Sequence, residues 1–256
     1  MRREVSTSRP KKVGREQDER ISLRDVTYEI SYRSHLIPDD EDIYSYCSFG
    51  SGRILLVDDE GETVEIGNFS FDLIDCIRAE SAELDPIDVF DCQSAELSYL
   101  YGALFKVGTY ELQETVFQKL FPDMDYEFDS YDRSDIMYLK TFALLPKFRG
   151  QKIASYLIEK IFSDLGGLVQ MMVVNANPIL RYESEHDQKA MVPPKSKREI
   201  AKSKAAVRRF YKRLGFSLIP QDPTETNEYV FMARAKNGTP ETAFSKKLYG
   251  ELFKFA

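Results

Sequence analysis

The residues best suited to chemistry lie in two segments of the second half of the chain. The first is LLPKFRGQKIASYLIEK, Leu144–Lys160, in which an apolar run ends in a proline and an Arg-Gly pair leads into an amphipathic helix. Backbone N–H groups at a helix N-terminus lie at the positive end of the helix dipole and can bind phosphate. Arg149 and Lys152 add positive charge there, and Gly150 permits close approach. The segment therefore predicts a phosphate-binding loop.

The second segment is RRFYKRLGF, Arg208–Phe216, about fifty residues further along the chain. Its basic residues can meet phosphate groups or simply solvate one face of a helix, and both interpretations stay open. Tyr211 lies one turn before the end of this helix and next to Phe210. From its position alone, Tyr211 is an amphipathic packing residue.

Together the two segments resemble the acyl-CoA-dependent N-acyltransferases of the GCN5-related (GNAT) superfamily. In that family a strand leads into an Arg/Gln-x-x-Gly-x-Gly/Ala loop over the cofactor pyrophosphate, and a later helix ends in Tyr-x-x-x-Gly-Phe. Here Arg149–Ala154 aligns with the loop, and Tyr211, Gly215 and Phe216 match the second pattern. Lys152 occupies the place of the loop's usual middle glycine. The resemblance covers residues 136–234.

The resemblance implies that acetyl-CoA is the cosubstrate and that the acceptor is an amine, on a small molecule or a protein. It implies a general-acid role for Tyr211, which would protonate the departing CoA thiolate. A packing role for Tyr211 is the alternative. The residues that we expect to bind the cofactor are Leu144, Leu145, Arg149, Gly150, Gln151, Lys152, Ile153, Ala154, Asn175 and Arg208.

The general base is poorly defined by the sequence. Some members of the superfamily place a glutamate on the strand before the loop, where this chain has Tyr138. A phenol with an ordinary pKa near 10 is a poor base. Asp135, Glu183 and Glu185 could relay a proton through water, or they could be surface carboxylates. The residues that we expect to contact the substrate are Tyr138, Asn177, Tyr182 and Glu183.

Hydrophobic periodicity supports an α/β chain, and the resemblance implies the GNAT-like acyl-CoA N-acyltransferase fold, an α+β mixed sheet, central and twisted, flanked by helices. We expect strands over residues 26–32, before and after a turn at 59–61, and over 136–144, 168–177 and 229–234. We expect helices over residues 86–105, 111–121, 152–165, 203–215 and 243–255. A disordered basic arm, residues 1–20, precedes a single GNAT-like domain, 21–256, with its core motifs at 136–234 and an insertion at 178–202.

Composition narrows the function classes. The chain of 256 residues has three widely spaced cysteines and two histidines, so we expect neither a disulfide framework nor a metal site. We expect no membrane segment and no signal peptide, and hence a cytoplasmic protein. Residues 38–96 carry seventeen acids against two bases, which suits a basic acceptor.

Two alternatives to the enzyme remain open. One is a catalytically weak or inactive GNAT-like binding module, because Lys152 departs from the loop pattern. The other is a nucleic-acid-associated protein that uses the basic arm, although the arm lacks interleaved aromatic residues and we expect no nucleic-acid partner. The sequence leaves the oligomeric state open, with a homodimer as one possibility.

Overall fold

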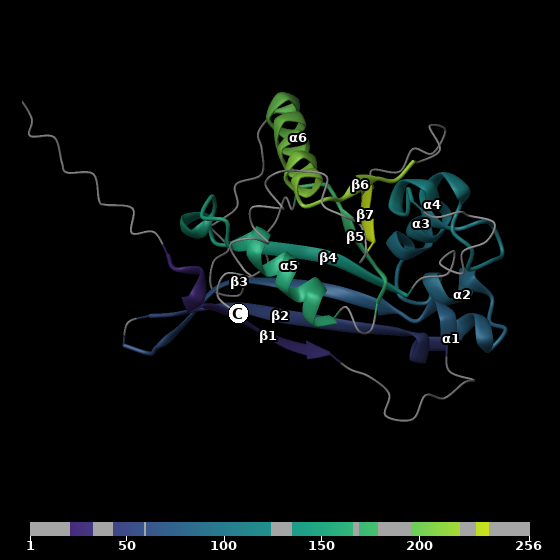
Figure 1. Cartoon of the computed structure of the whole chain (residues 1–256), viewed down its shortest axis with the longest axis horizontal. Helices are drawn as coiled ribbons and strands as arrows, with labels where there is room; N and C mark the ends of the chain where they lie inside the picture. The colour runs from purple at the N-terminus through teal and green to yellow at the C-terminus, as the bar shows by residue number, and fades with distance from the viewer. Residues whose placement is uncertain are drawn as a thin grey trace, which may run out of the picture.

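One mixed sheet organises the described part of the chain. The computed structural model describes residues 21–32, 43–58, 60–123, 135–165, 169–178, 196–220 and 229–235. Within them, seven strands form a sheet in the order β1-β2-β3-β4-β5-β7-β6 (Figure 1). The strands are β1 Val26–Tyr32, β2 Cys47–Val57, β3 Thr63–Ile74, β4 Ile136–Leu144, β5 Met171–Asn175, β6 Ser217–Leu218 and β7 Phe231–Ala235. The expected mixed sheet is confirmed.

The helices fall into two groups. The helices α1 Cys76–Ser81, α2 Pro86–Asp91, α3 Ala95–Leu104 and α4 Glu114–Leu120 gather at one end of the sheet, while α5 Ile153–Leu165 crosses it and α6 Lys197–Arg213 projects from it (Figure 1). Short 3-10 turns are η1 Leu23–Asp25, η2 Ile43–Tyr46 and η4 Pro146–Phe148.

Local capping explains where two of these helices differ from the sequence prediction. The single helix expected over 86–105 is two helices, because the Ser94 hydroxyl accepts a hydrogen bond from the Leu97 N–H and starts α3 afresh. The helix expected from residue 203 begins earlier, at Lys197, where Ser196 and Glu199 form a capping box. The last residues of the predicted insertion therefore belong to α6.

The sheet separates two apolar clusters. Side chains alternate across β4, so Ile136 and Tyr138 face one cluster while Met137 and Leu139 face the other. The first cluster lies under α1–α4, and the second contains α5 together with Tyr211 of α6. Each face of the sheet is thus buried by its own set of helices.

The pairing of β4 changes along its length. β4 pairs antiparallel with β3 and parallel with β5, and its parallel pairing with β5 stops at Leu139 opposite Val174. β4 then continues to Leu144, whereas β5 remains paired with β7 up to Asn175 opposite Phe231. The last five residues of β4 therefore have no register partner on β5.

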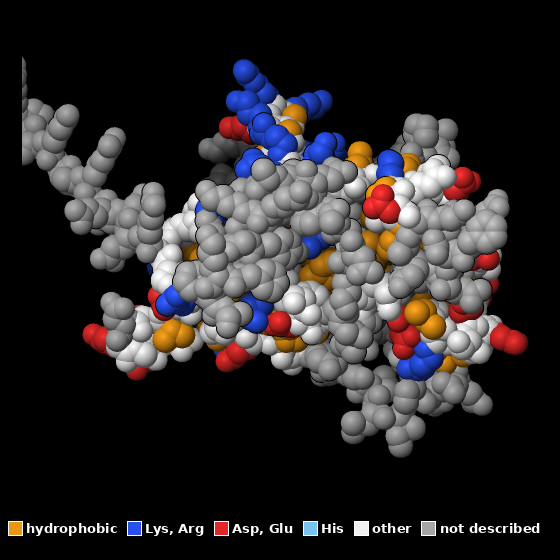
Figure 2. Space-filling view, viewed as in Figure 1, with side chains coloured by type: hydrophobic (Ala, Val, Ile, Leu, Met, Phe, Trp, Pro, Cys, Tyr) orange, Lys and Arg blue, Asp and Glu red, His pale blue; other side chains and the backbone are white. Residues whose placement is uncertain are grey.

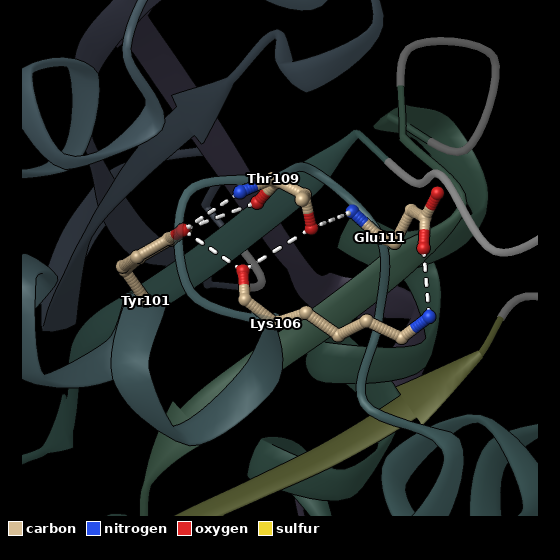
Figure 3. A network of polar contacts seen from close by, with 4 residues as sticks. All are labelled: Tyr101, Lys106, Thr109 and Glu111. Atoms are coloured by element: carbon tan, nitrogen blue, oxygen red, sulfur yellow. Dashed lines mark hydrogen bonds and ion pairs between the residues drawn. The ribbon is translucent and has the colours of Figure 1, made fainter.

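A polar network fixes the loop that joins α3 to α4 (Figure 3). The Tyr101 hydroxyl donates to the Lys106 carbonyl at 3.0 Å and accepts from the Thr109 N–H at 3.1 Å. The Lys106 ammonium pairs with the Glu111 carboxylate at 2.7 Å. Because Tyr101 belongs to α3, the network anchors the C-terminal end of that helix.

Among the described residues, no helix is long and apolar enough to cross a membrane.

Candidate active site

The predicted phosphate loop joins the end of β4 to α5 and has the backbone conformation that glycine favours at two positions. Gly150 has φ of 80° and Lys152 has φ of 66°. A left-handed lysine costs about 1 kcal/mol because its Cβ crowds the backbone. The loop keeps this conformation although the side chain at the second position disfavours it. Lys152 therefore stands at a position whose backbone conformation glycine would adopt more easily.

Two side chains of the loop hold its shape. The Arg149 Nε donates to the Leu144 carbonyl at 2.9 Å, and the Gln151 Nε2 donates to the Lys147 carbonyl at 3.2 Å. The Leu145 N–H donates to the Ile66 carbonyl on β3, which ties the loop to the sheet. In the first turn of α5, Ile153 is buried and Ala154 is half-buried. The backbone N–H groups of this turn point toward the loop.

Tyr211 lies in the apolar cluster on the same face of the sheet as the loop. Its ring packs edge-on against Phe210 and Phe216, with centroids 5.2 and 5.4 Å apart. Leu144 and Ile153 belong to the same cluster. Burial raises the pKa of the Tyr211 phenol, so the hydroxyl keeps its proton at neutral pH. A protonated phenol is the form that a general acid needs.

A buried ion pair holds the end of α6 against α5. Arg234 of β7 makes a bidentate contact with Glu159 of α5, at 2.5 and 2.9 Å, and also donates to the Leu214 carbonyl at 2.8 Å. Both charged side chains are almost fully buried. Since Leu214 closes the helix that carries Tyr211, the ion pair positions the phenol relative to α5.

The opposite face of the sheet holds a carboxylate that the sequence analysis did not select. Glu96 lies in the first turn of α3 and is half-buried. Its Oε1 accepts hydrogen bonds from the Tyr138 hydroxyl at 2.6 Å and from the Asn175 amide at 2.7 Å. Tyr138 comes from β4 and Asn175 from the end of β5, close to where the pairing of these strands stops. Both neutral donors engage one carboxylate oxygen.

The sequence did contain a signal for Glu96. The buried residues of α3 are Leu97, Leu100, Tyr101 and Leu104, and Glu96 precedes Leu100 by four residues. On a helix, residues four apart share a face, so Glu96 lies beside the buried stripe. A carboxylate at the edge of a buried helical stripe is a candidate functional group.

A second polar pair lies close to Glu96. Asp72 of β3 is the register partner of Tyr138, and its carboxylate meets the Lys140 ammonium at 3.1 Å. Burial raises the pKa of Asp72, an effect that Lys140 opposes and the charge of Glu96 reinforces. The α1–α4 face thus concentrates charge near the end of the β4–β5 pairing.

The remaining predicted residues fall in several places. Asn177 is half-buried just beyond β5, and Arg208 is exposed on α6, where Lys and Arg side chains gather at the top of the space-filling view (Figure 2). Asp135 accepts from the Ile77 N–H at 3.0 Å, and burial raises its pKa to about 6. Because that bond holds the first turn of α1, Asp135 has a structural contact. Tyr182 and Glu183 lie outside the described residues.

The order of these elements matches the expectation drawn from the two motifs. β4 leads through the loop into α5, and α6 ends in Tyr211 and Gly215 before the final strands. The sheet is mixed, with helices over both faces. This arrangement agrees with the fold that the GNAT resemblance implies. Among the described residues, no group of three or more His, Cys, Asp or Glu side chains could hold a metal ion.

Comparison with known proteins gives likenesses only at the level of structure. No family model matches the chain, and no curated protein matches it. Arabidopsis thaliana NAA60, solved in complex with acetyl-CoA, has a TM-score of 0.36 and 12% identity, covering 74% of this chain and 77% of that one.

Two further solved structures resemble the chain to a similar degree. A histone acetyltransferase HPA2 and related acetyltransferase from Corynebacterium glutamicum has a TM-score of 0.28 and 14% identity, covering 77% of this chain and 68% of that one. FeeM, an N-acyl amino acid synthase from uncultured soil microbes, has a TM-score of 0.32 and 12% identity, covering 82% and 92%. At these scores the likenesses carry no argument about function, which rests on the motifs and the geometry.

Proposed function

We propose that this chain is an acyl-CoA-dependent N-acyltransferase that moves an acetyl group from acetyl-CoA to a primary amine. The observation that carries the proposal is the Glu96 carboxylate, held by Tyr138 and Asn175 where β4 and β5 cease to pair. Acyl transfer from a thioester to an amine needs a base on the acceptor side and phosphate recognition on the donor side. In this proposal the α1–α4 face supplies the base, Glu96, and the α5 face supplies the phosphate-binding loop.

The donor would bind at the loop. The N–H groups of Gly150–Ala154 and the N-terminus of α5 would hold the pyrophosphate, with the Lys152 ammonium as an additional positive charge. Beyond Leu139, backbone groups of β4 have no β5 partner, so they can hydrogen-bond the amides of an extended pantetheine chain. This arrangement would direct the thioester toward the sheet between Glu96 and Tyr211.

The chemistry removes two protons from the acceptor nitrogen and delivers one to the departing sulfur. Glu96 would accept a proton from the acceptor ammonium, which frees the nitrogen lone pair. The nitrogen then attacks the thioester carbonyl, a C–N bond forms and the C–S bond breaks. The Tyr211 hydroxyl would donate its proton to the departing thiolate, which leaves as free CoA. The second proton that the nitrogen loses as the amide forms would return the Tyr211 phenolate to its protonated form. Tyr138 and Asn175 would orient Glu96 so that its Oε2 faces the acceptor.

Calorimetry and thiol release with acetyl-CoA test this proposal. Binding should stabilise the protein by about 2.7 kcal/mol at a hundredfold excess over the dissociation constant. The Glu96→Gln variant should bind acetyl-CoA normally and lose on the order of 10²-fold in turnover or more. Asp91→Asn, a change at an exposed acid of α2, is the matched control and should behave as wild type.

Two outcomes would contradict the proposal. If millimolar acetyl-CoA leaves the melting temperature unchanged, the chain is a module that does not use this donor. If Glu96→Gln turns over as fast as Asp91→Asn, the base lies elsewhere.

A further inference from the structure

Four aromatic rings form a continuous series from the protein surface to Glu96. Tyr99 of α3 is 44% exposed, and its ring centroid lies 5.4 Å from that of Tyr229. Tyr229 stacks on Phe231 at 5.9 Å, and Phe231 meets the edge of Tyr138 at 6.1 Å. The hydroxyl of Tyr138 then donates to the Glu96 carboxylate. The series ends at the proposed base.

The four rings come from three separate parts of the chain. Tyr99 follows Glu96 by three residues on α3, so both lie on one side of that helix. Tyr229 lies two residues before β7, Phe231 begins that strand, and Tyr138 lies on β4. No single helical or strand repeat can produce this alignment. The tertiary fold brings the rings together next to the carboxylate.

The electrostatics of the series favour a cation. Burial raises the pKa of Tyr229, and the charge of Glu96 raises it further, which places Tyr229 within the field of that carboxylate. The Lys140 ammonium is paired with Asp72 and therefore does not offset Glu96. The faces of tyrosine rings also attract ammonium groups. Phe231 and Tyr138 are fully buried and support the outer pair, so the half-buried Glu96 beside Tyr99 and Tyr229 matches a positively charged, slender ligand.

We propose that Tyr99 and Tyr229 bind the acceptor, and that the acceptor is an ammonium carried on an unbranched aliphatic chain. The proposal rests on the acyltransferase function proposed above. The methylene chain packs against the exposed Tyr99 and the half-buried Tyr229, while the terminal nitrogen reaches Glu96. Lysine side chains and linear polyamines share this chemistry. Amino acids whose carboxylate adjoins the reacting amine would bring a negative charge next to Glu96 and are excluded.

The test compares acceptors and variants in the thiol-release assay with acetyl-CoA as donor. The acceptors are spermidine, a peptide with a single lysine and a blocked N-terminus, and glycine. We expect transfer to spermidine or to the peptide, which tells the two sources apart, and no transfer to glycine. Tyr99→Ala should raise the acceptor KM about fivefold or more, since the methylene chain loses the ring against which it packs, and leave the KM for acetyl-CoA unchanged.

Conservative and distant variants separate recognition from simple damage. Tyr99→Phe keeps the ring face and should restore the acceptor KM. Tyr44→Ala removes an equally large exposed aromatic of η2 outside the series and should have no effect. An unchanged acceptor KM in Tyr99→Ala, or efficient transfer to glycine, overturns the inference while leaving the acyltransferase function intact. Absence of transfer to every amine by the wild type would overturn both.

Discussion

The two faces of the sheet differ in how their buried carboxylates are bonded. On the face of α5 and α6, Glu159 and Arg234 neutralise each other through a bidentate contact, and Tyr211 is surrounded by apolar side chains. On the face of α1–α4, Glu96 is half-buried, and the donors that bond it within the described residues are the neutral side chains of Tyr138 and Asn175. The ion pair of Glu159 and Arg234 neutralises both charges and stabilises the fold. Both hydrogen bonds to Glu96 end on Oε1, so its Oε2 can accept a proton. This difference is the reason that we propose the α1–α4 face as the one that acts on the acceptor.

The largest effect should come from breaking the ion pair of the α5 face. Glu159→Gln would leave the Arg234 guanidinium buried without its counter-charge, which should lower the free energy of unfolding by about 3–5 kcal/mol. The adjacent Lys160, whose pair with Asp164 is exposed, provides the control, and Lys160→Gln should cost less than about 0.5 kcal/mol. Urea denaturation measures both. Equal effects would mean that burial does not distinguish the two pairs.

Replacing Tyr211 should reduce turnover, whereas replacing Tyr138 should reduce stability. Tyr211→Phe should leave stability nearly unchanged, because the ring keeps its apolar contacts, and reduce turnover about 10²-fold. Tyr138→Phe removes a hydrogen bond to Glu96 and should cost about 1–2 kcal/mol of stability. Thermal melts and steady-state kinetics on both variants test the contrast. Loss of acetyl-CoA binding in Tyr211→Phe would make that tyrosine structural.

The α1–α4 face should also carry a pH dependence. Burial raises the pKa of Asp135 to about 6, above its ordinary value, so the folded state binds a proton more readily than the unfolded state. Stability should therefore fall by about 1–2 kcal/mol as the pH rises from 4 to 6. Asp135→Asn keeps an acceptor for the Ile77 N–H and should remove this part of the slope. An unchanged slope in the variant would assign it to other groups.

The smallest effect should come from the phosphate loop. Lys152→Gly relieves a left-handed lysine and should stabilise the fold by about 1 kcal/mol or less. The same change should weaken acetyl-CoA binding a few fold and make it less sensitive to salt, since one cation is lost. Calorimetry at two salt concentrations measures the difference. Tighter binding in the variant would show that the lysine obstructs the phosphates.

The two faces also differ in how far the sequence could predict them. The loop and Tyr211 belong to motifs that are contiguous in the chain, and β1 and β4 begin and end at the predicted residues. The Glu96 site joins α3, β4 and β5, so no local pattern contains it. Periodicity places a residue on a face of one element, but it does not say which elements meet. The break before α3 was missed for a related reason, since it depends on one serine cap.

The contact between Arg234 and the Leu214 carbonyl suggests how acetyl-CoA bound at the loop could affect Tyr211, the proposed general acid. Glu159 lies on α5, whose N-terminus follows the phosphate loop, and Arg234 joins it to the residue that closes α6. Through these bonds, ordering of the loop by a bound ligand would also restrain the segment that carries Tyr211. Occupancy of the loop should therefore slow amide hydrogen exchange at the end of α6, without direct contact between that segment and the phosphates.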